Sequence, residues 1–86
     1  MREMEKPLKA LANRRRLAIL KHLKHHGEAS VGDIAREVRI SLKATSKHLG
    51  ILSGCDIVER EQRSAQAYYW LARSQSVPVE RIIALL

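Results

Sequence analysis

The side chains best suited to chemistry lie in the segment ISLKATSKHLGIL, residues 40–52. Lys43 and Lys47 are four residues apart, so they lie one turn apart on the same face of a helix. Ser41 and Ser46 add hydroxyl groups beside them. Ammonium and hydroxyl groups near a helix N-terminus bind phosphate well. The spacing therefore predicts a phosphate-binding face, although lysines also occur on helix faces that contact only solvent.

A second group of cations is the run Arg14, Arg15 and Arg16, which opens a predicted helix. Positive charge at a helix N-terminus opposes the helix dipole, so the run calls for an explanation. We interpret Arg14 and Arg15 as phosphate contacts. We expect Arg16 to be structural and to pair with an acidic residue such as Glu59 or Asp33.

Two further kinds of side chain could bind or react. His22 and His26 have the i, i+4 spacing of a metal site, but two ligands alone make a weak one, so we predict no metal. The single cysteine, Cys55, excludes an internal disulfide. It follows Gly54 where an apolar residue is normal, and we interpret it as a small buried side chain rather than a redox switch.

No combination of these residues makes an enzyme. The chain shows no Ser/His/Asp set, glycine-rich phosphate loop or pair of carboxylates, and so predicts no catalytic residue and no cofactor.

Composition narrows the class of partner. The 86 residues include 16 Lys and Arg but 9 Asp and Glu, a formal net charge of +7 that favours a polyanion. No apolar stretch is long enough to span a membrane, and the first residues lack the apolar core of a signal peptide, so we expect a cytoplasmic protein. So small a core also favours an oligomer.

Apolar spacing predicts the helices that position these side chains. A first helix ends near Leu11, and a second runs from Arg14 to about His25 with Asn13 as its N-cap. Gly27 ends the second helix.

Residues 31–53 are predicted to form a helix-turn-helix. Ser30 caps its first helix, with Asp33 in the first turn, and Ser41 caps the second, at 42–53. A turn of about three residues makes two short helices cross steeply.

After residue 57 the pattern changes from helical to alternating. Residues 57–72 are predicted to form a β-hairpin with a polar tip, with Tyr68 and Trp70 on one face and Tyr69 on the other. A last helix at 78–86 has a broad apolar face that a core this small can hardly absorb. The expected fold is mainly α with a small β-hairpin: four helices, a hairpin and a last helix, a winged helix-turn-helix domain over residues 1–86.

Three segments carry a family resemblance. LKALANRRRLAILKHL, SVGDIAREVRISLKATSKHLGIL and VEREQRSAQAYYWL resemble, in order and spacing, the ArsR-type (arsenic-repressor-like) winged-helix transcriptional regulators. The resemblance covers nearly the whole chain, from about Leu8 to Leu71. Each segment alone is a weak signal, but the three in register with the hairpin are specific.

The resemblance implies roles for particular residues. The helix at 42–53 would enter the major groove of DNA, the hairpin would reach the minor groove or backbone, and the terminal helices would form a homodimer. His48 would be partly packed, with structure and phosphate contact equally open as its role. Together with the arginine run, the implied DNA-binding residues are Ser41, Leu42, Lys43, Ser46, Lys47, His48, Gln62, Arg63, Ser64, Gln66, Arg14 and Arg15. The implied dimer residues are Leu8, Val79, Ile82, Ile83 and Leu86.

The chain departs from the family at two places. Leu42 stands where the family usually has a polar residue such as Gln, although a leucine can contact a thymine methyl group. The family's metal-sensing cysteines and histidines are absent from SVGDIAREV, and VPVERIIALL offers only Glu80. The resemblance therefore implies a member that senses no metal.

We accordingly expect a homodimeric, sequence-specific DNA-binding regulator, a repressor, that places two copies of helix 42–53 in successive major grooves. Its half-sites would be one helical turn, about 10 base pairs, apart. Two alternatives stay open: a protein-interaction module that uses the apolar face at 79–86, and a nucleic-acid-binding protein without sequence preference.

Overall fold

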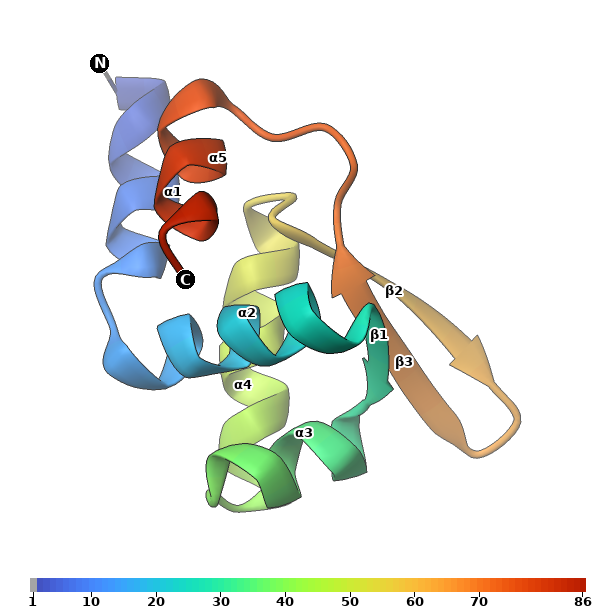
Figure 1. Ribbon diagram of the computed structural model, residues 1–86. Coiled ribbons are helices and arrows are strands. Elements are labelled where there is room, and N and C mark those ends of the chain that lie inside the picture. The colour runs from blue at the N-terminus through green and yellow to red at the C-terminus, as the bar shows by residue number, and fades with distance from the viewer. Residues whose placement is uncertain (1) are drawn as a thin grey trace.

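Five helices and three strands make up the chain (Figure 1). The computed structural model describes residues 2–86, and only the backbone of Arg2. The elements, in chain order, are α1 (Arg2–Leu11), α2 (Arg14–His26), β1 (Glu28–Ser30), α3 (Val31–Val38), α4 (Leu42–Gly54), β2 (Val58–Arg63), β3 (Gln66–Leu71) and α5 (Val77–Ala84).

The three predicted N-caps are confirmed. The side chain of Asn13 accepts hydrogen bonds from the backbone N–H groups of Arg15 and Arg16, each at 3.0 Å. The Ser30 hydroxyl accepts from Asp33 N at 3.2 Å, and the Ser41 hydroxyl accepts from Ala44 N at 3.0 Å. Each cap satisfies backbone donors that the first turn of a helix leaves without partners.

The corner between α3 and α4 is the predicted helix-turn-helix. Arg39 turns the chain with φ of 57°, in the left-handed region, and Ile40 N donates to Ala35 O at 3.2 Å. Ile34 of α3 and Leu49 of α4 are fully buried there. Thr45 is also buried, and its hydroxyl donates to Ser41 O at 2.9 Å, so this polar group has a partner.

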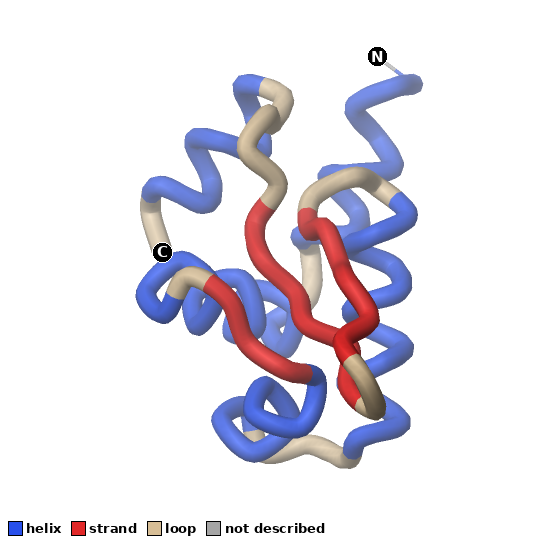
Figure 2. The backbone as a smooth tube through the Cα atoms, turned by 90° about the vertical axis from the view of Figure 1, so that its right-hand side faces the viewer, coloured by secondary structure: helices blue, strands red, loops and turns tan. Residues whose placement is uncertain are grey.

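The sheet has one strand more than the predicted hairpin. The strand order is β1-β3-β2, and all pairs are antiparallel (Figure 2). Ala29 of β1 pairs with Tyr69, and both are buried on the face against the helices. Sequence analysis missed β1 because it has only three residues, none of them β-branched or aromatic.

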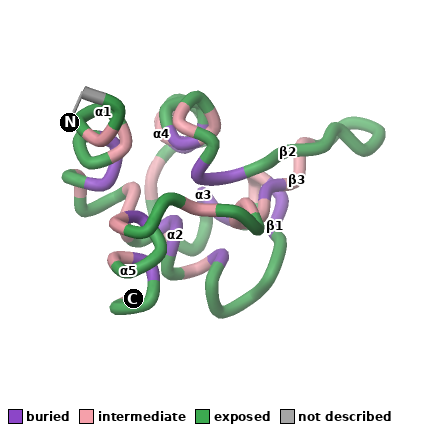
Figure 3. The backbone as a smooth tube through the Cα atoms, turned by 90° about the horizontal axis from the view of Figure 1, so that it is seen from above, coloured by how far each residue is buried: buried purple, intermediate pink, exposed green. Residues whose placement is uncertain are grey.

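The prediction of a broad free face on the last helix is wrong in part. Val79 and Ile83 of α5 are 2% and 8% exposed, because α5 packs on α1 and α2 and closes the core (Figure 3). Ile82 and Leu86 are half-buried against the same core. The core therefore absorbs about half of a face that we expected to lie free. No helix within residues 2–86 is long and apolar enough to cross a membrane.

Candidate nucleic-acid interface

The exposed face of α4 carries the predicted reading residues. Thr45, Leu49 and Leu52 lie on the inner face with no exposed surface, so the positions between them point outward. These outward positions are Leu42, Lys43, Ser46 and Lys47, and Leu42 is 56% exposed.

The two lysines of this face are unpaired. Within residues 2–86, neither Lys43 nor Lys47 makes an ion pair or a side-chain hydrogen bond. Ser46 is likewise unpaired, whereas the Ser41 hydroxyl is engaged as the N-cap. The face thus presents two mobile ammonium groups beside the positive end of a helix dipole, an arrangement that attracts phosphate.

His48 lies at the back of this face and contacts α2. Arg16 donates from Nη1 to His48 Nδ1 at 3.2 Å, which assigns the ring proton to Nε2. Burial, followed by the charge of Arg16, lowers the pKa of His48, so the ring is neutral near pH 7. One ring nitrogen therefore serves the α2–α4 contact, and the other is left for solvent or DNA.

Arg16 has carbonyl partners rather than the acidic partner that we expected. Its Nε donates to Ala10 O at 2.5 Å and its Nη2 donates to Lys9 O at 3.3 Å. These carbonyls belong to the last turn of α1, where backbone acceptors lack partners within the helix. The expected pairing with Glu59 or Asp33 is wrong because capping α1 satisfies this guanidinium locally.

The other two arginines of the run, Arg14 and Arg15, are exposed at the start of α2. Neither has an ion pair or a side-chain hydrogen bond within the part of the chain that the structure describes. Their assignment to phosphate stays a prediction.

The wing carries Gln62, Arg63, Ser64 and Gln66, all exposed around a turn in which Ser64 has φ of 53°. Gln62 Nε2 donates to Ser64 O at 3.1 Å and so braces the turn. Arg63, unlike the lysines of α4, is engaged: its Nη1 lies 2.5 Å from a Glu28 carboxylate oxygen, and its Nε donates to Glu61 at 2.6 Å. Hydrogen bonds from Arg63 lower the pKa of Glu28, so the pair stays charged at neutral pH.

Sequence analysis missed one cation of the wing. Arg60 is exposed, and its guanidinium carbon lies 5.8 Å from the ring centroid of Tyr69, the aromatic residue on the helix-facing side of the sheet. Its Nη2 donates to Gln62 Oε1 at 3.0 Å. Strand alternation places Arg60 and Gln62 on one face and Arg63 on the other, and this signal was available from the sequence.

The histidine pair forms no metal site with a third ligand. The rings of His22 and His26 are stacked with their centroids 4.1 Å apart, and burial followed by the charge of His26 lowers the pKa of His22. No group of three His, Cys, Asp or Glu side chains that could hold a metal occurs within residues 2–86.

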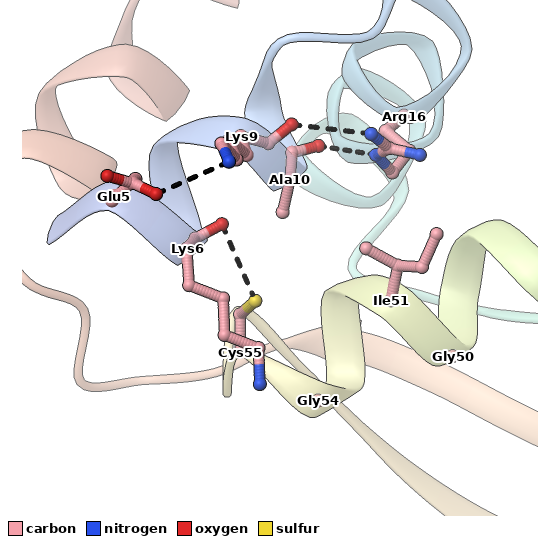
Figure 4. A pocket seen from close by; sticks show the side chains of 9 residues that line it. All are labelled: Glu5, Lys6, Lys9, Ala10, Arg16, Gly50, Ile51, Gly54 and Cys55. Atoms are coloured by element: carbon pink, nitrogen blue, oxygen red, sulfur yellow. Dashed lines mark hydrogen bonds and ion pairs between the residues drawn. The ribbon is translucent and has the colours of Figure 1, made fainter. Parts of the chain in front are cut away.

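Cys55 is half-buried rather than fully buried as we expected. Its Sγ lies 3.9 Å from Lys6 O at the edge of a cavity of about 500 Å³ between α1 and the C-terminal half of α4 (Figure 4). Lys6 and Arg16 also line this cavity, and it lies away from the predicted reading residues.

An α3–α4 corner with an exposed cationic helix, followed by an antiparallel wing, defines a winged helix of the DNA-binding class. Residues 11–61 match a family described as a helix-turn-helix domain. The transcriptional activator HlyU of Vibrio cholerae is 36% identical over the whole chain and 82% of its own length. The arsenical resistance operon repressor of Bacillus subtilis is 30% identical over 80% of the chain, which spans 66% of that repressor.

A solved structure agrees with both relatives. It is the homodimeric winged helix-turn-helix DNA-binding domain of a possible ArsR-family regulator from Mycobacterium bovis, with a TM-score of 0.80 and 35% identity, covering 96% of this chain and 73% of that one. The chain belongs to the ArsR-type family of winged helix-turn-helix transcriptional regulators. The relatives are regulators of transcription and not enzymes.

Proposed function

We propose that two copies of this chain bind a pseudo-palindromic DNA site and insert the α4 helices into successive major grooves, and that the bound protein represses transcription. The observation that carries this proposal is the unpaired cationic face of α4, with Lys43 and Lys47 one turn apart beside the helix N-terminus. Half-sites about 10 base pairs apart fit such a dimer. A cytoplasmic location, with access to DNA, and independence of metal and cofactor belong to the proposal.

Each part of the interface has its own task in this proposal. Lys43 and Lys47 hold phosphates, while Leu42 and Ser46 lie close enough to the groove to contact base edges. Gln62, Ser64 and Gln66 of the wing contact the neighbouring backbone or minor groove, with Arg63. Further positive charge and hydrogen-bonding groups come from Ser41, His48, Arg14 and Arg15.

The dimer surface that we propose is smaller than the one predicted from sequence. Leu8 is 39% exposed, and Ile82 and Leu86 are half-buried, so these three can contact a second copy. Leu85, which sequence analysis did not single out, is 86% exposed on the same terminal segment. Because Val79 and Ile83 lie in the core, the apolar face proposed for the alternative docking module is also reduced.

Selection of bound duplexes from a random pool, with tight binders then titrated with salt, tests the DNA-binding proposal. The expected result is a two-fold symmetric consensus, preferred over random DNA at physiological salt. Equal affinity for random DNA would refute sequence-specific regulation. Placing the selected site over a reporter promoter then tests repression: lower reporter expression with the protein supports it, and higher expression contradicts it.

Sedimentation of Leu85→Glu tests the dimer surface, since a charged side chain at so exposed a position leaves the fold intact. We expect monomers, whereas the matched variant Leu42→Glu, an exposed leucine on α4, stays dimeric. A dimer of unchanged affinity in Leu85→Glu and in Ile82→Glu would place the interface elsewhere.

A further inference from the structure

The tip of the wing is tied to the far edge of the sheet by a single side chain. Arg63 of β2 donates two hydrogen bonds to the carboxylate of Glu28 on β1, at 2.5 and 3.3 Å, and a third to Glu61 at 2.6 Å. Because the strand order is β1-β3-β2, the guanidinium must reach across β3 to meet Glu28. We call the Glu28–Arg63 contact the clasp.

The clasp lies on the outer face of the sheet. The guanidinium carbon of Arg63 lies 4.7 Å from the ring centroid of Tyr68 and 6.0 Å from that of Trp70. Side chains alternate along a strand, so these two rings share a face opposite to the buried Tyr69. Arg63 is therefore directed over the outer face, whereas Arg60 lies on the helix-facing side near Tyr69.

The clasp also neutralises the charge of the wing tip. Two carboxylates, Glu28 and Glu61, surround one guanidinium in a chain whose formal net charge is +7. The three side chains are between 41% and 57% exposed, so DNA can reach this contact. A phosphate accepts the same paired hydrogen bonds from a guanidinium as a carboxylate does, and it can replace the carboxylate without change of geometry at the arginine.

We propose that Glu28 is a positioning residue for DNA binding, which holds Arg63 over the outer face of the sheet in the free protein and releases it to a DNA phosphate. This inference rests on the proposed function, because it needs the wing to meet DNA. Binding must break the clasp before Arg63 can contact a phosphate. Glu28 therefore lowers the affinity of the wing for DNA although it touches no DNA itself.

The test compares Glu28→Gln with Glu59→Gln in DNA-binding titrations of the full chain, with the duplex taken from the random-pool selection. Glu59 is a matched control because it lies on the same face of the sheet, carries the same charge and bonds to Trp70 rather than to Arg63. Both variants remove one negative charge, so both gain affinity from reduced long-range repulsion. We expect Glu28→Gln to gain about two- to fivefold more per protomer, the usual range for an exposed ion pair.

Salt dependence and an arginine-deficient background give two further readouts. The advantage of Glu28→Gln over Glu59→Gln should narrow as salt rises, since salt screens the exposed clasp in the unmodified protein. In an Arg63→Ala background the two variants should become equal, since no arginine is left to release. Nitrogen-15 NMR of the Arg63 side chain should show its Nε–H signal shift on addition of duplex, and in the free protein on Glu28→Gln but not on Glu59→Gln.

The outcomes separate this inference from the proposed function. If Arg63→Ala weakens DNA binding while Glu28→Gln and Glu59→Gln bind equally, the wing contacts DNA and the positioning role of Glu28 is refuted. Weaker binding by Glu28→Gln than by the unmodified protein, with circular dichroism showing an intact fold, refutes it too. If Arg63→Ala has no effect in either the unmodified or the Glu28→Gln background, the wing contact of the proposed function also fails.

Discussion

The polar face of α4 and the tip of the wing both carry positive charge, but they hold it in opposite ways. Lys43 and Lys47 extend from a rigid helix and have no partner within residues 2–86. Arg63 extends from a hairpin and is held by two carboxylates. The helix therefore offers its charge at once, at the cost of ordering two long side chains, whereas the wing must first break a contact that already exists.

This difference predicts unequal contributions to binding. Phosphate contacts made by free lysines release counterions from DNA and add the full dependence on salt. A contact made by Arg63 replaces one exposed ion pair by another, so its net contribution is smaller. The α4 face should supply most of the affinity, and the wing should adjust it.

The largest effect should come from removing the support beneath the α4 face. Leu49 is fully buried, so Leu49→Ala should lower the free energy of unfolding by about 2–5 kcal/mol through lost contacts and a residual cavity. Urea denaturation measures this. Leu42→Ala, on the exposed side of the same helix, should change it by less than about 0.5 kcal/mol. Similar effects of both would show that the two faces of α4 are not distinguished as we describe.

The next effect concerns the free lysines. Lys43→Ala combined with Lys47→Ala removes four charges per dimer, so the slope of log affinity against log salt should fall by about 3.6, or roughly 0.9 per phosphate. Affinity near 0.1 M salt should fall by about a hundredfold or more. Lys21→Ala, an exposed lysine on α2, is the matched control and should leave the slope nearly unchanged. A double variant that behaves like Lys21→Ala would remove this face from the interface.

A smaller effect should follow from loss of the cap that starts α4. The Ser41 hydroxyl accepts from Ala44 N, so Ser41→Ala should lower the free energy of unfolding by about 1 kcal/mol. Ser41→Asp, which keeps an acceptor at the cap, should retain most of the stability while adding a charge that repels DNA. Thermal unfolding and DNA titration together separate the two roles, and equal stability of all three proteins would contradict the capping role.

The smallest effect concerns pH. The pKa values of His48 and His22 lie below the ordinary value of about 6.5, chiefly because both rings are partly buried. The unfolded chain then binds more protons than the folded one just below pH 6.5, so stability decreases as pH falls through this window. Tm measured at pH 7.5 and 5.5 should differ less in His48→Gln than in the unmodified protein. An equal difference in both would contradict a contribution from His48.

Local signals predicted the scaffold of the interface well. Asn13, Ser30 and Ser41 announce their helices because a capping side chain acts within three residues of itself, and the α3–α4 corner follows from the short turn between two such caps. The winged helix fold predicted from these elements is confirmed by the comparisons.

Contacts between distant residues were not predictable in the same way. Arg16 finds its carbonyl partners in the preceding helix, and Arg63 finds Glu28, 35 residues away, only because β1 pairs with β3. Sequence alone gives no indication of which of several carboxylates a guanidinium will meet. The burial of Val79 similarly depends on how α5 crosses α1 and α2, which its own apolar pattern does not specify.

The pairing of β1 with β3 has a consequence for folding kinetics. β1 precedes the helix-turn-helix and β3 follows it, so their hydrogen bonds close a loop that contains both α3 and α4. Closing this loop before the helices form has a large entropic cost, whereas compact helices shorten the distance that the chain must span. The helix pair should therefore form first, and the three-stranded sheet should complete the native structure late in the folding reaction.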